Sequence, residues 1–302
     1  MTQRAQNAAP AGAHVAPTLP RDINQAIQFD PDLREAGDTI VRLVTILDDP
    51  RSDARKVEAV MKTNVGLTVR LLRIANSPLY RGATAVGTVR EAVARLGFGT
   101  VRHLALSAVA MSAFKRPNPM SDVLWRHSLL VATLTRTLMA WRSPPGDADL
   151  GFTAGLLHDM GKLVLLQAFP KRYARVFEAA MASGWQFAPH EQAEFGTTHA
   201  EVGAALAVRW YLDPRLQLVM RYHHRLARLA TVETDAETKS LVMAIRVADE
   251  MFRAQHLEGD QVAEEPVELP PPAIVNMIGD HGYRVIWTKA LAEYRTLMPL
   301  FD

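Results

Sequence analysis

Apolar residues recur every three or four positions along most of this chain, which is the spacing that places them on one face of an α-helix. The segment 122–141 shows this period, and the segment 101–114 is apolar nearly all round, as in a buried helix. No stretch alternates apolar and polar residues for long enough to propose a β-sheet. The pattern therefore predicts an all-α fold.

Short breaks divide the chain into parts. We expect a disordered tail over 1–20, which is rich in Ala, Pro, Gln and Gly, and an N-terminal helical lobe over 21–116. The run from Lys115 to Pro119 ends that lobe, since proline cannot continue a helix. A second helical lobe is expected over 117–258, followed over 259–302 by an acidic, proline-rich loop and C-terminal helices. Further helices are predicted at 39–47, 57–61, 65–74, 86–96, 152–169, 173–181, 198–211, 214–224, 238–255, 273–279 and 284–297.

Composition narrows the class of protein. The net charge of +2 over 302 residues is too balanced to indicate nucleic acid or a membrane as a direct partner, so we expect neither. The most apolar stretch, 104–114, is too short to span a bilayer. The chain contains no cysteine, which excludes disulfides and thiolate metal sites and agrees with the expected location in a reducing cytoplasm.

Histidines and aspartates interrupt the apolar helical segments of the second lobe. Burying such groups is costly unless they are paired or bound to metal. Imidazole and carboxylate are good ligands for first-row transition metals, and a carboxylate can bridge two ions. These residues predict a site for one or two divalent ions such as Fe, Mn, Zn or Ni, with a metal-free polar network as the alternative. The candidate metal ligands are His127, His158, Asp159, His199, His223, His224 and Asp249.

Lys162 lies three residues after Asp159 and four after His158, so it shares their face on the predicted helix 152–169. It is either a structural residue, as a charge partner of Asp159 or as a solvated end, or a clamp for a phosphate oxygen. Adjacent residues on a helix point about 100° apart. His158 and Asp159 can therefore converge only on an ion that lies in a groove between helices.

Several motifs resemble the HDOD family, a group of HD-related output domains. These are LLRIANSPLY at 71–80, EAVARLG at 91–97, LWRHS at 124–128, GLLHDMGKL at 155–163 and HAEVGAALAVRW at 199–210. The resemblance covers roughly 19–253 and implies an HD-like helical bundle with an additional N-terminal helical lobe. The order of the seven candidate ligands is similar to that of the HD-GYP phosphodiesterases, and it favours His199 over His190 as a ligand.

One departure from the HD-GYP pattern bears on function. Arg225 and Leu226 follow His223 and His224, where those enzymes carry a glutamate and then a Gly-Tyr-Pro segment. The resemblance therefore implies a regulatory, signal-transducing module that acts through a partner protein, with a nucleotide or phosphate as a further ligand to consider. The alternative is a metal-dependent phosphohydrolase acting on a nucleotide or cyclic dinucleotide, in which Asp159 and Lys162 would be catalytic.

Overall fold

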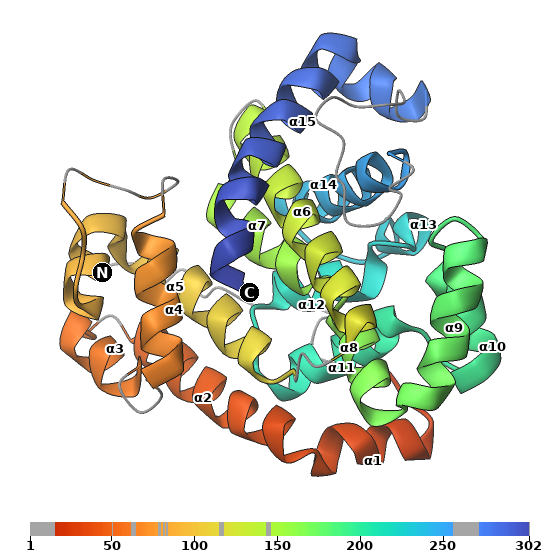
Figure 1. Ribbon diagram of the computed structural model, residues 1–302, viewed down its shortest axis with the longest axis horizontal. Coiled ribbons are helices and arrows are strands. Elements are labelled where there is room, and N and C mark those ends of the chain that lie inside the picture. The colour runs from red at the N-terminus through yellow and green to blue at the C-terminus, as the bar shows by residue number, and fades with distance from the viewer. Residues whose placement is uncertain are drawn as a thin grey trace, which may run out of the picture.

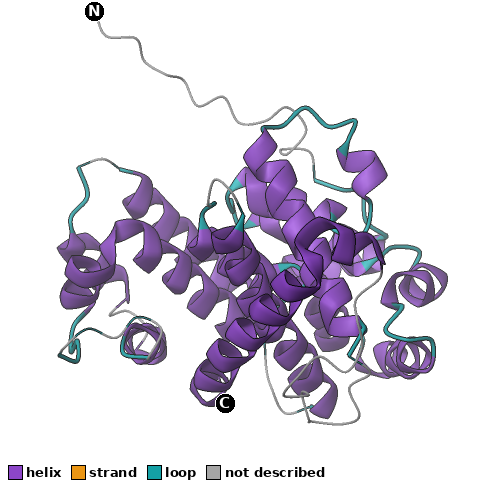
Figure 2. Ribbon diagram, turned by 90° about the horizontal axis from the view of Figure 1, so that it is seen from above, coloured by secondary structure: helices purple, strands orange, loops and turns teal. Residues whose placement is uncertain are grey.

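The computed structural model is built from helices (Figures 1 and 2). It describes residues 16–49, 51–61, 65–77, 80, 82, 84–114, 118–142, 146–255 and 272–301, and no strand occurs within these ranges. The predicted all-α fold is confirmed. Most of the predicted tail over 1–20 and most of the predicted loop after 259 lie outside the described residues.

Five helices lie in the described N-terminal part of the chain. They are α1 (Arg21–Phe29), α2 (Pro31–Asp48), α3 (Ala54–Met61), α4 (Val65–Ala75) and α5 (Val89–Ser112). Asp30 begins α2, because its side chain accepts a hydrogen bond from the Leu33 amide at 2.9 Å. Gly97 takes φ +80° and interrupts α5, which separates the two predicted helices 86–96 and 101–114. Helix α1 was not predicted from the sequence.

Nine helices follow in the described part of the second predicted lobe. They are α6 (Pro119–Trp141), α7 (Ala148–Leu157), α8 (Met160–Ala168), α9 (Pro170–Ala182), α10 (Phe187–Phe195), α11 (His199–Arg209), α12 (Pro214–Tyr222), α13 (Leu226–Leu229) and α14 (Ala236–Arg253). Helix α6 is buried along most of its length and packs against α7 and α14. The last helix, α15 (Pro272–Phe301), runs beside α6 (Figure 1) and is interrupted at Gly279, between the predicted helices 273–279 and 284–297.

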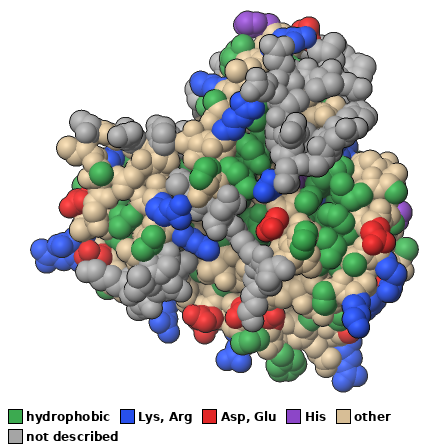
Figure 3. Space-filling view, viewed as in Figure 1, with side chains coloured by type: hydrophobic (Ala, Val, Ile, Leu, Met, Phe, Trp, Pro, Cys, Tyr) green, Lys and Arg blue, Asp and Glu red, His purple; other side chains and the backbone are tan. Residues whose placement is uncertain are grey.

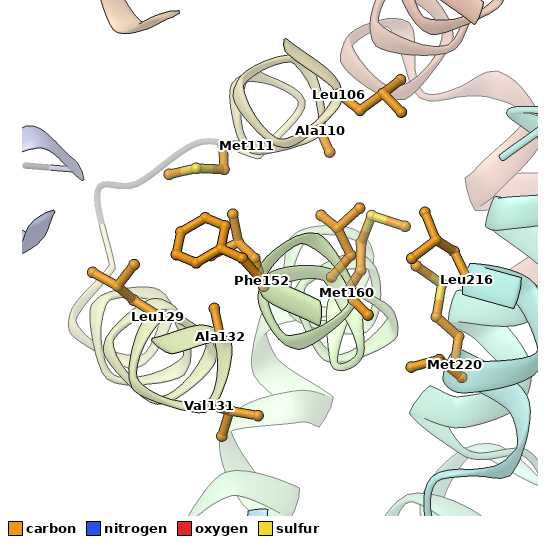
Figure 4. Close-up of a cluster of buried hydrophobic side chains, with 14 of the residues drawn as sticks. Leu106, Ala110, Met111, Leu129, Val131, Ala132, Phe152, Met160, Leu216 and Met220 are labelled. Atoms are coloured by element: carbon orange, nitrogen blue, oxygen red, sulfur yellow. The ribbon is translucent and has the colours of Figure 1, made fainter. Parts of the chain in front are cut away.

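The apolar core is continuous across the helices of both predicted lobes. Figure 4 shows side chains of α5, α6, α7, α8 and α12 gathered in one buried cluster. Its labelled members are Leu106, Ala110, Met111, Leu129, Val131, Ala132, Phe152, Met160, Leu216 and Met220. Helix α5 packs on α7, and α15 packs on α4 as well as on α6. These packing contacts cross the predicted boundary at 116/117. The division of the chain into two lobes at that position therefore remains a prediction.

Two predicted helices end sooner than the sequence indicated at places that matter for the candidate ligands. The helix predicted over 152–169 is broken at His158 and Asp159 into α7 and α8, and Asp159 takes the non-helical angles φ −101° and ψ 13°. The helix predicted over 214–224 ends at Tyr222, so His223 and His224 lie in the turn that follows. In both places the residues that leave the helix are candidate ligands. Their side chains are therefore not held in the directions that a continuous helix would impose.

Close helix packing brings the candidate ligands together. A side chain at Gly161 in α8 would collide with the carbonyl oxygen of His199 in α11, so only glycine allows this approach. Gly155 in α7 has the same role against α6, since a Cβ there would lie 2.5 Å from the Cα of Ala132. The two glycines flank the His158–Asp159 break and hold it between α6 and α11.

Candidate metal centre

Seven side chains from separate elements converge at one buried point. His127 comes from α6, His199 from the first turn of α11 and Asp249 from α14. The other four come from the break between α7 and α8 and from the turn after α12. Six of the seven are at most 4% exposed, and His224 is partly buried. The set consists of all the ligands predicted from the sequence: His127, His158, Asp159, His199, His223, His224 and Asp249.

Asp159 lies at the middle of this cluster. Its Oδ2 atom is 3.1 Å from Nε2 of His127 and 3.2 Å from Nε2 of His158. Its Oδ1 atom is 3.3 Å from Nε2 of His199 and 3.6 Å from Nε2 of His223. The two carboxylate oxygens thus face two different groups of imidazoles, which is the arrangement that a carboxylate bridging two ions requires.

The ligand atoms fall into the same two groups by distance. His127, His158 and Asp249 form one group, and Asp159, His199, His223 and His224 form the other. Within each group the ligand atoms all lie within 4.8 Å of one another. Each group could hold a metal ion, and an ion in the first would also lie beside Oδ2 of Asp159.

Buried polar atoms without hydrogen-bond partners show that the residues fit a cation. Nε2 of His127, His158 and His223 is buried without a hydrogen bond, as are Oδ1 of Asp159 and Oδ2 of Asp249. Leaving a buried donor or acceptor unsatisfied costs about 1–3 kcal/mol each. A cation held by each group would satisfy these five atoms, because a cation binds lone pairs on nitrogen and oxygen.

Hydrogen bonds behind the imidazoles orient these lone pairs. Nδ1 of His158 donates to the carbonyl oxygen of Gly155 at 2.7 Å. Nδ1 of His223 donates to the carbonyl oxygen of Val219 at 3.0 Å. A carbonyl can only accept, so Nδ1 of each ring carries a proton, and in the neutral form of the ring the lone pair of Nε2 faces the centre.

Glu191 in α10 gives His199 the same orientation, although Glu191 was not among the site residues predicted from the sequence. Its carboxylate accepts from the backbone amide of His199 at 2.8 Å and contacts Nδ1 of the same residue at 2.5 Å. The hydroxyl of Tyr173 donates to the other oxygen at 3.0 Å. Burial acts to raise the pKa of Glu191, but His199 and Lys162 lower it overall, so the carboxylate is charged. Glu191 lies eight positions before His199 in a helix that was not predicted, so no local sequence pattern connected the two residues.

Burial keeps three of the imidazoles uncharged. It lowers the pKa of His223 to about 4, and it also lowers the pKa of His127 and of His224. These rings are therefore neutral at pH 7, which is the form that binds metal. For Asp159, burial acts to raise the pKa, but the neighbouring His158, Lys162 and His199 hold it well below the usual range.

Lys162 is inside the protein and not at an open site. It is 4% exposed, and its Nζ lies 2.5 Å from Oδ2 of Asp159. The same ammonium group lies 4.2 Å from the ring centroid of Phe187 in α10. Of the two interpretations made from the sequence, this position fits a charge partner of Asp159.

The turn between α9 and α10 covers the centre. Gly184 and Trp185 both have left-handed backbone angles, with φ of +69° and +64°. The indole ring of Trp185 has its centroid 5.3 Å from that of His127 and 5.1 Å from that of Phe252. His190 lies outside the cluster, with its Nε2 3.0 Å from the Ser183 hydroxyl, so it is His199 that joins the other ligands.

The family model for the HDOD domain matches residues 33–226. This chain belongs to the HDOD domain family. The match spans α5 to α12 in full and all of the candidate ligands except Asp249.

Relatives of this HDOD chain share its fold at low sequence identity. An HDOD domain protein of unknown function from Geobacter sulfurreducens is 25% identical, has a TM-score of 0.60, and matches over 95% of this chain and 91% of its own. A candidate signal transduction protein from Marinobacter aquaeolei is 21% identical, with a TM-score of 0.68, over 93% of this chain and 64% of its own. A candidate metal-dependent phosphohydrolase from Shewanella amazonensis is 19% identical, with a TM-score of 0.53, over 93% and 92%.

An uncharacterized protein from Treponema pallidum is 24% identical over 276 residues, which is 90% of this HDOD chain. The chain spans about half the length of that relative.

The HDOD chain departs from the HD-GYP pattern immediately after its paired histidines. Arg225 follows His224 and forms an ion pair with Glu201 of α11 at 2.9 Å. Thr197 donates a further hydrogen bond to the same carboxylate at 2.9 Å. The guanidinium group is thus held on α11 and is not aimed at the metal centre.

Proposed function

We propose that this HDOD protein is a regulatory module of a signalling pathway whose buried centre holds divalent transition-metal ions without hydrolysing a phosphoester. The burial of the centre carries the proposal. His127, His158 and Asp159 are at most 2% exposed, and Trp185 lies against His127. A hydrolase must place its phosphate within contact of the ligand atoms, and six of the seven candidate ligands are at most 4% exposed.

The donor set indicates which ions the centre would hold. Three imidazoles on one side of Asp159, two imidazoles and the carboxylate of Asp249 on the other, and Asp159 between them suit Fe, Mn, Zn or Ni better than Mg or Ca. Two bound metal ions would supply Lewis acidity and would activate a water molecule. In the closed arrangement the residues around that pair exclude substrate, so the ions serve to fix the positions of α6, α8, α11 and α14.

A phosphohydrolase is the second candidate, and a specific observation favours it. All seven ligands predicted from the HD-GYP order are present and converged. The Shewanella amazonensis protein with the same fold is a candidate metal-dependent phosphohydrolase. This function would require the turn at Gly184 and Trp185 to move away from His127 so that substrate could enter.

The signalling role draws on the family and on the surface. The candidate signal transduction protein from Marinobacter aquaeolei shares this fold. Charged side chains of both signs are scattered over the face shown in Figure 3. This face therefore lacks the continuous positive surface that attracts nucleic acid. None of the helices in the described residues is both long enough and apolar enough to cross a bilayer. A module of this kind would pass its signal through contact with another protein.

Turnover by the metal-loaded chain tests the proposal. The protein is reconstituted with Mn, Fe, Zn or Ni and incubated with cyclic dinucleotides and a panel of nucleotides, beside the His158→Ala and Asp159→Asn variants. We expect no rate above that of the variants. Hydrolysis by the wild-type protein that disappears in both variants would establish the phosphohydrolase instead.

A further inference from the structure

A groove separate from the metal centre lies where α2 meets the C-terminal end of α11, whereas His199 lies in the first turn of that helix. The groove has a volume of about 530 Å³, and its floor is formed by Ile27, Leu33, Val41 and Trp210. Trp210 is 1% exposed, and its Nε1 donates to the carbonyl oxygen of Leu33 at 3.1 Å. The apolar floor is therefore fixed by a hydrogen bond between the two elements that form it.

The rim of the groove carries an excess of positive charge. Arg34, Asp38 and Arg42 follow one another at four-residue spacing on α2, and Arg209 lies opposite them on α11. All four side chains are exposed, and none forms an ion pair with another residue that the structure describes. Three guanidinium groups beside one carboxylate leave a net positive rim, which is complementary to an acidic ligand.

Tyr211 adds an aromatic group to the same rim. It is 71% exposed and has φ +53°, a left-handed conformation that is rare for a bulky residue. Holding such a residue there costs on the order of 1–3 kcal/mol, and conformations of this kind cluster at functional sites. Its neighbour Trp210 fits tightly against Gly37, where a Cβ would lie 2.7 Å from the indole. The packing of Trp210 thus fixes the turn that presents Tyr211.

We propose that this groove, defined by Arg34, Arg42, Arg209, Trp210 and Tyr211, docks an acidic segment of a partner protein. Arginine, tyrosine and tryptophan dominate the binding energy of protein interfaces. Guanidinium groups bind carboxylates in a bidentate manner, and an apolar side chain of the segment would enter the floor. The inference rests on the proposed function, because it names the surface through which a regulatory module would contact its partner.

A random peptide library displayed on phage, selected against the full immobilised chain, tests this inference. We expect the enriched peptides to contain several Asp or Glu residues with one apolar or aromatic side chain. Their affinity, measured by fluorescence anisotropy, should fall about tenfold or more in the Arg34→Gln/Arg209→Gln double variant and in Tyr211→Ala. It should also fall as the salt concentration rises. A control variant, Arg55→Gln/Lys171→Gln, removes two exposed charges outside the groove and should bind as the wild type does.

Several results would overturn the inference. These are no enrichment, enrichment of peptides that are not acidic, or equal binding to the wild type and to groove variants that circular dichroism shows to be folded. Binding of inorganic pyrophosphate or ATP in the groove, without binding of any peptide, would make it a site for a small anion. None of these results alters the turnover assay, so failure of the docking surface is distinguishable from failure of the proposed function.

Discussion

The indole ring of Trp185 lies against the imidazole ring of His127, with the two ring centroids 5.3 Å apart. Trp185 belongs to a turn of two left-handed residues between α9 and α10, whereas His127 is a candidate ligand on helix α6. This contact separates the candidate metal ions from solvent on one side. The position of this turn therefore decides whether the centre is closed, as in the proposed regulatory module, or open to substrate, as in an enzyme.

Removing the indole should open the centre. In Trp185→Ala we expect metal to be lost to a competing chelator about tenfold faster, because solvent and chelator gain access to His127. The release is followed by the absorbance of a metal-chelator complex. Trp141→Ala is the matched control, since Trp141 lies at the far end of α6 and is 47% exposed. Equal release rates in wild type and Trp185→Ala would show that the turn does not limit access.

Glu191 should set the metal affinity of His199 without contacting an ion. In Glu191→Gln the amide cannot stabilise the ring of His199 as the carboxylate does, and loss of such partners costs about 10–100-fold in metal affinity. Competition titration with a chelating dye measures the effect. Glu194→Gln is the control, because Glu194 lies on the same helix but pairs with Arg172 and Arg175. An unchanged affinity in Glu191→Gln would contradict the positioning role.

A buried carboxyl far from the centre gives a pH-dependent prediction. Burial raises the pKa of Glu293 in α15 to about 7, although Arg136 lies 3.6 Å away. Because this pKa is higher in the folded than in the unfolded chain, the protonated side chain favours folding. That contribution is complete below about pH 4.5 and is lost as the pH rises towards 7. Glu293→Gln, which stays neutral, should therefore become more stable relative to wild type by about 2–3 kcal/mol between about pH 5 and 8.

Denaturant unfolding at several pH values measures this difference. The exposed Glu35 of α2 supplies the control, since Glu35→Gln should show no such trend. The prediction would be wrong if the free energy of unfolding of Glu293→Gln differed from that of the wild type by the same amount at every pH in this range.

Periodicity was sufficient to predict the helical fold, and motif order was sufficient to propose candidate ligands whose side chains lie close together in the structure. The apolar period of 122–141 corresponds to α6, and the glycine at 97 interrupts α5 where the sequence indicated a break. The seven candidate ligands could be proposed together because charged or polar groups in apolar helices need a shared partner. Their convergence is the feature that the structure adds.

The break at His158 and Asp159 could not be predicted from periodicity or from motif order. The segment 152–169 is apolar enough to form one continuous helix, and only packing of Gly161 against His199 shows why the chain turns there. Trp185 and Glu191 were missed for a related reason. Both act from the α9–α10 region, and their contacts with the centre are tertiary, so no local spacing marks them.

Metal stoichiometry tests the central claim most directly. The full chain is reconstituted anaerobically with Mn or Fe, desalted, and measured by mass spectrometry of its metal content, beside Asp159→Asn and the control His190→Ala. Because Asp159 faces both groups of ligands, we predict two ions per chain in the wild type and the control, and neither ion retained in Asp159→Asn. A wild-type chain that binds no ion, or an Asp159→Asn chain that binds as many as wild type, would contradict the account.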